Sequence, residues 1–144
     1  ISHLPDLEEI FSEFARVLKP GGSLVLSTHH PIHDFLIVRE QEYPDLSEAW
    51  GSDLDPAVEA IDEETNYHET EAFDIYWGGS KSENPNRYYR RPLRGLLKPL
   101  LSAGFELDDL IEPSPDRAFE EEFPELSQEM VRHPPEALCL RAKS

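Results

Sequence analysis

Cysteine is almost absent from this sequence, and long apolar runs are missing. The single cysteine, Cys139, excludes an internal disulfide, and its place in the apolar run Ala137-Leu138-Cys139-Leu140 predicts a small buried residue. No apolar stretch approaches the length needed to span a bilayer, and no signal peptide is visible. We therefore expect a soluble, cytoplasmic protein.

Basic residues are scarce as well. Thirteen Lys and Arg face thirty Asp and Glu, which gives a formal net charge of −17 and a pI near 4.6. Such a surface repels nucleic acid and anionic membranes, so neither is an expected partner. High charge with modest hydrophobicity is typical of disordered chains. It is also typical of salt-adapted (halophilic) proteins, and we favour that interpretation because the acids punctuate apolar periodic segments.

The first forty residues predict a helix, a sharp stop and a strand. The apolar positions Leu7, Ile10, Phe11, Phe14, Val17 and Leu18 fall on one helical stripe, and Asp6 with Glu9 has the spacing of a capping box. Pro20-Gly21-Gly22 ends the helix. Ser23 to Thr28 is short and apolar, which predicts an interior strand.

The remainder divides into an irregular middle and an ordered end. From Pro31 to about Tyr89 no long period is sustained, although Glu71 to Trp77 alternates as a strand does. A second helical stripe runs from Leu93 to Leu101, where Pro99 should kink or restart the helix, and Gly104 closes it. Strands are predicted over 105–112 and 137–142, with a proline-punctuated acidic loop between them.

Two phrases of the sequence are similar to class I S-adenosylmethionine-dependent methyltransferases of the type 11 kind. The first is His3-Leu4-Pro5-Asp6-Leu7 followed by Ala15-Arg16-Val17-Leu18-Lys19-Pro20-Gly21-Gly22 and the strand; the second is Ser102-Ala103-Gly104-Phe105 with Glu112-Pro113. The resemblance implies an α/β fold: the C-terminal half of a doubly wound, Rossmann-like sheet, comprising strands five to seven and their covering helices. It covers 1–31 and 90–144, and 32–89 becomes an aromatic-rich insert, a substrate lid or a satellite core.

The glycine-rich loop that binds the methyl donor in this family has no counterpart in the sequence. None of the seven glycines forms a Gly-x-Gly motif, so the loop that holds the methyl donor is expected before residue 1. The expected function is methyl transfer from S-adenosylmethionine to a small-molecule acceptor by a longer parent chain. The 144 residues alone are expected to be inactive.

Three histidines are the candidate catalytic and donor-site residues. The fifth strand of the family delivers His29 and His30 to the edge of the sheet that faces the acceptor, where a histidine can serve as general base. The alternative is that one of them only caps the strand end by hydrogen bonding. By the same resemblance, His3 lies at the rim of the donor site.

The candidate substrate-binding residues are Tyr67, Tyr76, Trp77, Tyr89 and Arg90. The aromatic side chains form either a lid over an apolar acceptor or the core of a small subdomain. Arg90 belongs to the cluster Arg87, Arg90, Arg91 and Arg94, which either pairs with neighbouring carboxylates or binds an anionic acceptor group. No metal site is expected, because the four-residue spacing of His29 and His33 joins ligands only on a helix and Pro31 argues against one.

Two rival functions remain. A non-catalytic binding or assembly module derived from the same fold would use the aromatic insert as its contact surface. A different transferase would need paired carboxylates such as Asp53/Asp55 or Asp108/Asp109, which occur readily by chance in so acidic a chain. In the methyltransferase interpretation, the missing first four strands leave one sheet edge and the apolar helix faces open, which predicts a homodimer or association through that edge.

Overall fold

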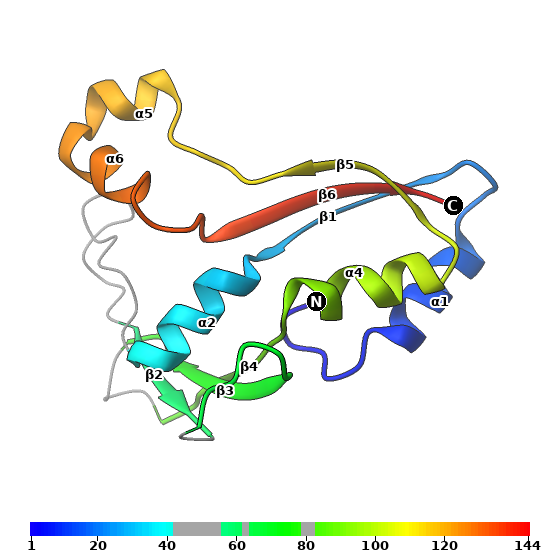
Figure 1. Ribbon diagram of the computed structural model, residues 1–144, viewed down its shortest axis with the longest axis horizontal. Helices are drawn as coiled ribbons and strands as arrows, with labels where there is room; N and C mark the ends of the chain where they lie inside the picture. Colours follow the sequence, from blue (N-terminus) through cyan, green and yellow to red (C-terminus); the bar gives the residue numbers. More distant parts are fainter. Residues whose placement is uncertain (42–55, 62–63, 79–82) are drawn as a thin grey trace.

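The computed structural model describes residues 1–41, 56–61, 64–78 and 83–144 (Figure 1). In chain order the elements are α1 (Glu8–Val17), β1 (Ser23–His29), α2 (Pro31–Glu40), β2 (Ala57–Ala60), β3 (Glu71–Tyr76), β4 (Asn86–Arg90), α4 (Leu93–Ser102), β5 (Glu106–Ile111), α5 (Arg117–Glu122), α6 (Pro124–Met130) and β6 (Ala137–Lys143). The α/β class predicted from the sequence is confirmed. None of the described helices is long and apolar enough to cross a membrane.

The first sheet joins the two ends of the chain in the order β1-β6-β5. The last strand, β6, lies between the other two and is antiparallel to both, so that β1 and β5 run in the same direction. The register pairs Ser23 with Lys143 at one end and His29 with Ala137 at the other. The strands predicted over 105–112 and 137–142 are β5 and β6.

The turn before β1 depends on glycine. Gly21 has φ of +75°, a conformation that residues with a Cβ rarely adopt, and its N–H donates to the Ser144 carbonyl at 2.9 Å. A Cβ on Gly22 would lie 2.7 Å from the Lys19 carbonyl oxygen. At the other end of α1, Asp6 Oδ1 accepts the Glu8 N–H at 2.8 Å. The N-cap is Leu7, which makes no side-chain cap hydrogen bond, so the capping box predicted for Asp6 and Glu9 is not the arrangement that begins α1.

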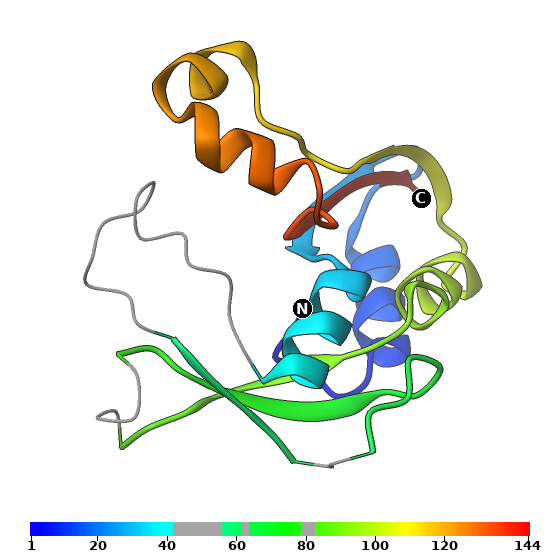
Figure 2. The same ribbon diagram turned by 60° about the vertical axis from the view of Figure 1, so that its left-hand side comes forward.

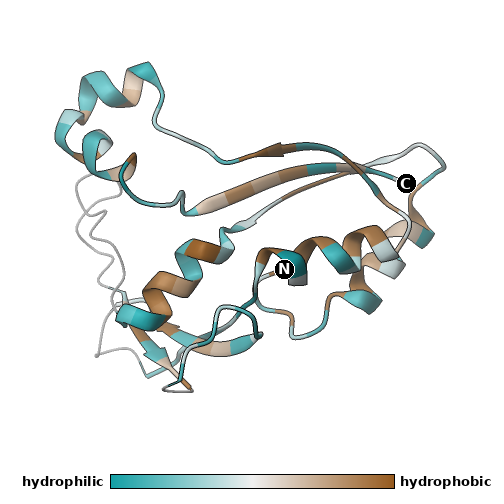
Figure 3. Cartoon of the chain, in the orientation of Figure 1, coloured by the Kyte–Doolittle hydropathy of each residue, from teal (hydrophilic) through white to brown (hydrophobic). Residues whose placement is uncertain are grey.

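Helices α1 and α4 cover one face of this sheet. Their buried residues and those of the strands form one apolar core: Leu7, Phe11, Leu96, Leu100, Phe105, Leu138, Leu140 and Ala142. Figure 3 shows the apolar residues along β6 and on α4. The helical stripes read from the sequence are the faces that make this core.

The opposite face of the sheet is largely exposed. Val25 on β1 is 70% exposed and Ile111 on β5 is 53% exposed, and Cys139, predicted to be buried, is half-buried. The prediction of an interior strand is therefore wrong for β1, which is an edge strand among the described residues. Burial on both faces needs layers on both sides, and the described residues provide one.

The insert folds as a second antiparallel sheet in the order β2-β3-β4, and α2 packs on it (Figure 2). Ile37 and Val38 from α2 join Val58, Phe73, Ile75 and Tyr88 in a separate buried cluster. The strand predicted from Glu71 is β3. The boundary predicted between the insert and the C-terminal segment, at residues 89 and 90, falls inside strand β4. This strand ends at Arg90, and α4 begins three residues later, at Leu93.

Three local predictions need correction. Pro31 does not prevent a helix, because it occupies the first helical position of α2, where its missing N–H costs no intrahelical bond. The predicted loop 113–135 contains the two helices α5 and α6. Asp116 caps the start of α5 with its side chain, and Pro124 stands in the first turn of α6. Pro99 lies inside α4, which runs without interruption from Leu93 to Ser102.

Candidate functional site

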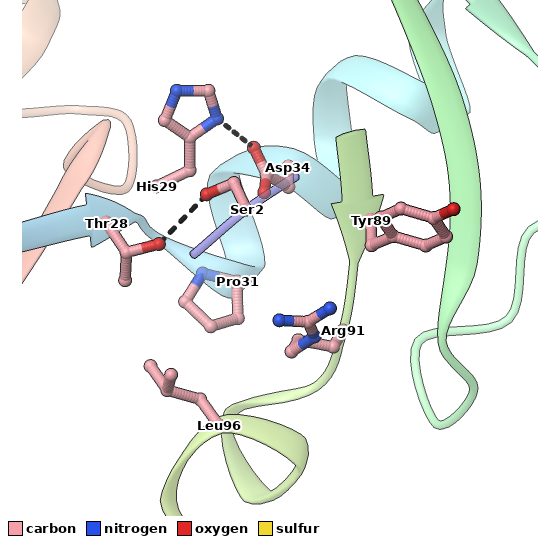
Figure 4. Close-up of a pocket in the computed structure, with 8 residues that line it drawn as sticks. All are labelled: Ser2, Thr28, His29, Pro31, Asp34, Tyr89, Arg91 and Leu96. Atoms are coloured by element: carbon pink, nitrogen blue, oxygen red, sulfur yellow. Dashed lines mark hydrogen bonds and ion pairs between the residues drawn. The ribbon is translucent and has the colours of Figure 1, made fainter. Parts of the chain in front are cut away.

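A small pocket lies where the end of β1, the start of α2 and the segment from β4 to α4 meet (Figure 4). The chain places its residues there for local reasons. Strand β1 ends at His29, His30 stays extended as the N-cap, and Pro31 begins α2, so that the first turn of α2 folds back beside the strand end. The lining residues are Ser2, Thr28, His29, Pro31, Asp34, Tyr89, Arg91 and Leu96.

His29 and Asp34 form a hydrogen-bonded pair within this pocket. His29 Nδ1 lies 3.0 Å from Asp34 Oδ1, and the Asp34 side chain is only 5% exposed. Burial lowers the pKa of His29, but the hydrogen bond to Asp34 and its negative charge outweigh burial and raise that pKa above 6.5. Burial likewise raises the pKa of Asp34, yet its contacts with His29 and His33 hold it below its ordinary value. The carboxylate of the pair is therefore ionised at neutral pH.

The ring of His29 is fixed from its other side by aromatic side chains. It stacks on Tyr88, with 5.2 Å between ring centroids and an interplanar angle of 12°, and Tyr88 in turn stacks on Phe73 at 5.5 Å. The residues that the structure describes make no hydrogen bond to His29 Nε2. With Nδ1–H donated to Asp34, Nε2 carries the lone pair and can accept a proton.

The segment before α1 completes the wall. Ser2 Oγ lies 2.9 Å from Thr28 Oγ1, and the Ser2 carbonyl accepts the Tyr89 N–H at 2.7 Å. His3 lies beside this contact, with its ring 4.3 Å from the Tyr88 ring and its Nδ1 2.7 Å from the Arg87 carbonyl oxygen. His3, predicted for the donor site, does not itself line the pocket.

His30 is not among the residues that line the pocket. Its side chain is 4% exposed, Nδ1 accepts the Ile32 N–H at 3.2 Å, and Nε2 lies 2.9 Å from Glu112 Oε1. Both ring nitrogens are therefore engaged within the chain. His30 thus makes a capping hydrogen bond, as one alternative predicted, although the cap is at the start of α2 rather than on the strand.

Arg90 has a fully buried side chain, enclosed by the insert. It pairs with Glu71 at 2.6 Å and donates to the carbonyl oxygens of Asn66, Tyr67 and Glu69. The guanidinium also lies over the Phe35 ring, 5.5 Å from its centroid. Arg90 therefore organises the 66–71 segment and has no face on the pocket.

The four predicted aromatic residues have different surroundings. Tyr89 lines the pocket. Tyr67 packs edge-on against Phe35, and its hydroxyl accepts the Leu93 N–H at 3.3 Å. Trp77 packs against the insert's buried cluster, with its N–H 3.4 Å from the Tyr88 hydroxyl, and Tyr76 donates to Glu59 at 2.9 Å. Of these four, Tyr89 is the one that lines the same pocket as His29.

Sequence reasoning did not select Asp34, Ser2 or Thr28, and it named Arg91 only as one member of the arginine cluster. Asp34 had a usable signal, because an acid in the fourth position of a helix that begins His-Pro lies in its first turn, next to the strand end. The others are brought in by the N-terminal segment and β4, whose contacts span more than twenty residues.

Other chemistry considered from the sequence finds no support in the described residues. No group of three His, Cys, Asp or Glu side chains is arranged to hold a metal ion in the part of the chain that the structure describes. Asp108 pairs with Arg141 and Lys143 on the exposed sheet face, and Asp109 also approaches Arg141. Asp53 and Asp55 lie outside the described residues.

Comparison with solved structures identifies the fold. Over 99% of its length, the chain superposes on a candidate S-adenosylmethionine-dependent methyltransferase from Listeria monocytogenes (TM-score 0.68, 22% identity) and on one from Mesorhizobium loti (TM-score 0.64, 22% identity). This chain has the fold of S-adenosylmethionine-dependent methyltransferases. A methyltransferase from Clostridium acetobutylicum superposes less closely, with a TM-score of 0.53 and 13% identity. No family model and no curated protein matches the sequence.

The chain spans 57% of the length of the first two of these methyltransferase structures and 53% of the third. That share agrees with the C-terminal half of a methyltransferase fold, as the Lys-Pro-Gly-Gly and Gly-Phe phrases predicted.

Proposed function

We propose that this chain forms the acceptor side of an S-adenosylmethionine-dependent methyltransferase that acts on a small molecule. The observation that carries the proposal is the His29–Asp34 pair, which lies in a pocket at the end of a strand of a methyltransferase fold. Ligands of open α/β sheets bind at the carboxyl ends of the strands, and β1 ends at this pocket.

The residues present fit the acceptor better than the donor. The seven glycines include no Gly-x-Gly motif, and the pocket holds one buried carboxylate that is already committed to a histidine. When bound, S-adenosylmethionine supplies a methyl group that its sulfonium has already activated. The contribution of this chain is therefore to hold the acceptor and to move its proton.

His29 is the proposed general base. Asp34 holds the Nδ1–H tautomer, so that Nε2 accepts the proton that an oxygen or nitrogen nucleophile loses as it becomes methylated. Tyr89 and Pro31 form the walls beside it, and Tyr88 keeps the imidazole ring from rotating. His30 has no role in this step, since both of its ring nitrogens are engaged elsewhere.

The test is transfer of a labelled methyl group by the natural protein in which this sequence occurs. Labelled S-adenosylmethionine is supplied with a mixture of small polar metabolites, and wild type is compared with His29→Gln and with His133→Gln as a matched control. We expect loss of the general base to slow transfer by about 10²–10⁴-fold. An equal rate in wild type and His29→Gln would overturn the assignment of the base.

We further propose that these 144 residues do not bind S-adenosylmethionine on their own. Calorimetric titration of the donor into the purified chain, at high salt, tests this directly. Absence of heat with a folded chain supports the proposal. Binding with micromolar affinity would show that the donor site needs no glycine-rich loop.

A non-catalytic assembly role is the second proposal, and the edge strand β1 favours it. Its sequence, Ser23-Leu24-Val25-Leu26-Ser27-Thr28-His29, contains no Asp, Glu, Lys, Arg or Pro, whereas the opposite edge, β5, carries three acids. Uncharged edge strands are prone to pair with other chains. Sedimentation of the purified chain distinguishes the outcomes, since a stable monomer at high concentration counts against association through β1.

A further inference from the structure

Arg91 differs from the other arginines of its cluster in its surroundings. Arg87 pairs with Asp74 at 2.6 Å, Arg90 pairs with Glu71 at 2.6 Å, and the exposed Arg94 donates to the His68 carbonyl at 2.8 Å. Arg91 is 7% exposed, donates to the Leu4 carbonyl, and has no carboxylate within ion-pair distance among the residues that the structure describes.

A buried guanidinium without a carboxylate is energetically costly. Arginine remains charged under all physiological conditions, and its five N–H groups all need acceptors when they are removed from water. This cost is reflected in the pKa of Arg91. Burial lowers that pKa, and the negative charges of Asp34 and Asp6, which raise it, do not compensate. A buried cation that has no ion-pair partner among the described residues suggests that another group supplies its anion.

The position of Arg91 shows where that anion would lie. Arg91 lines the same pocket as His29, together with Pro31, Leu96 and Tyr89 (Figure 4). The pocket therefore offers a cation beside apolar and aromatic walls, with Ser2 and Thr28 hydroxyls nearby. This combination suits an organic anion rather than an inorganic one.

The other charge in the pocket does not prevent anion binding. The Asp34 carboxylate is held by His29 at 3.0 Å, and the pair is neutral when His29 is protonated. Because Arg91 is also charged, the site as a whole then carries a net positive charge. When His29 gives up its proton, the site becomes neutral rather than negative.

We propose that Arg91 binds an anionic oxygen group, a carboxylate or a phosphate ester, carried by an organic acceptor whose reacting group faces His29. This inference rests on the proposed methyl transfer for the role of the ligand as acceptor. The binding of the anion itself does not depend on it, so the two can fail separately.

The first test follows the Arg91 Nε–H resonance of the wild-type chain by NMR during titration with benzoate and, separately, with phenyl phosphate. A saturable shift at Arg91, with the Arg90 and Arg94 resonances unmoved, supports the proposal, and the anion that binds more tightly identifies the class. Absence of a saturable shift with both probes overturns it.

Variants make the test specific. Arg91→Gln should weaken binding of the effective probe by about tenfold or more, because a charge-assisted pair of hydrogen bonds is lost, while Arg94→Gln should leave it unchanged. Arg91→Lys keeps the cation and serves if Arg91→Gln does not fold; it should retain binding that is weaker than that of wild type. Equal affinity in wild type and Arg91→Gln contradicts the proposal.

One further arm separates acceptor from donor, because S-adenosylmethionine also carries a carboxylate. If the natural protein shifts the Arg91 resonance with S-adenosylmethionine but not with either organic anion, Arg91 serves the donor and the proposal is wrong. Anion binding without any methyl transfer would instead overturn the proposed function and leave the anion subsite standing.

Discussion

His29 Nδ1 and Asp34 Oδ1 lie 3.0 Å apart, and this contact joins the end of β1 to the first turn of α2. The five-residue separation allows it because His30 remains extended and Pro31 starts the helix immediately. The first turn of a helix also favours a negative charge. The pair is therefore a consequence of the strand–cap–helix sequence, and it fixes which nitrogen of His29 faces the pocket.

Replacing Asp34 should reverse the pKa shift of His29. Burial alone lowers that pKa, and the Asp34 hydrogen bond and charge are the main effects that raise it. In Asp34→Asn we expect the pKa of His29 to fall, as measured by NMR titration of the imidazole resonances. Asp116→Asn, which removes a surface cap of α5, is the matched control and should change nothing at His29. An unchanged pKa in Asp34→Asn would show that the pair does not form in solution.

The same pair predicts how stability depends on pH. Because the folded pKa of His29 is raised, its contribution is fully present below 6.5 and is lost as the pH rises through the raised value. The free energy of unfolding in urea should therefore fall over that window in wild type. The fall should be absent or reversed in Asp34→Asn. A wild-type stability that rises over the same window would contradict the prediction.

Much of the fold was predictable because it rests on short-range patterns. The helical stripes, the glycine stop and the alternation at Glu71 each depend on neighbours within one or two turns. The errors at Pro31, at Asp116 and at Pro124 have one cause: a proline or a cap was interpreted as the end of regular structure, when it stands at the start of a helix.

The core prediction can be tested with two adjacent leucines. Leu100 is fully buried in the cluster under the first sheet, and Leu101 is 52% exposed on the same helix. Leu100→Ala should lower the free energy of unfolding by about 2–5 kcal/mol, and Leu101→Ala by less than about 0.5 kcal/mol. Urea denaturation of both variants provides the measurement. Similar losses in the two would mean that α4 packs through a different face.

The insert depends on the buried ion pair of Arg90. Arg90→Gln leaves Glu71 without its partner and removes donors from the carbonyl oxygens of the 66–71 segment. We expect a loss of about 3–5 kcal/mol in the free energy of unfolding, because one partner of a buried pair is left uncompensated. Arg117→Gln, at the exposed ion pair with Glu121, should cost far less. If the two variants are equally stable, the enclosure of Arg90 is wrong.

The net charge of −17 predicts a dependence on salt. Mutual repulsion of the carboxylates opposes the compact state, and the Debye length falls from about 10 Å at 0.1 M salt to about 3 Å at 1 M. The unfolding midpoint should therefore rise with sodium chloride over this range. A midpoint independent of salt would remove the support for salt adaptation.

The candidate site was only half predictable, and the reason is physical. His29 and Tyr89 were found because each stands near the end of a strand that the sequence pattern indicates. Arg91 and Ser2 were not chosen, because their roles arise from contacts between segments 87 and 26 residues apart. Arg90 was chosen over Arg91 although the two are adjacent, since nothing in the sequence says which of them faces inward to Glu71 and which faces the pocket.

The most direct test of the account is methyl transfer by the natural protein, measured with labelled S-adenosylmethionine and a panel of small organic acids, in wild type and His29→Gln. The account predicts label on at least one acid in wild type and a loss of about 10²–10⁴-fold in the variant, with His133→Gln unchanged. Transfer at equal rates in wild type and His29→Gln, or no transfer to any acid by a folded protein that binds the donor, would contradict it.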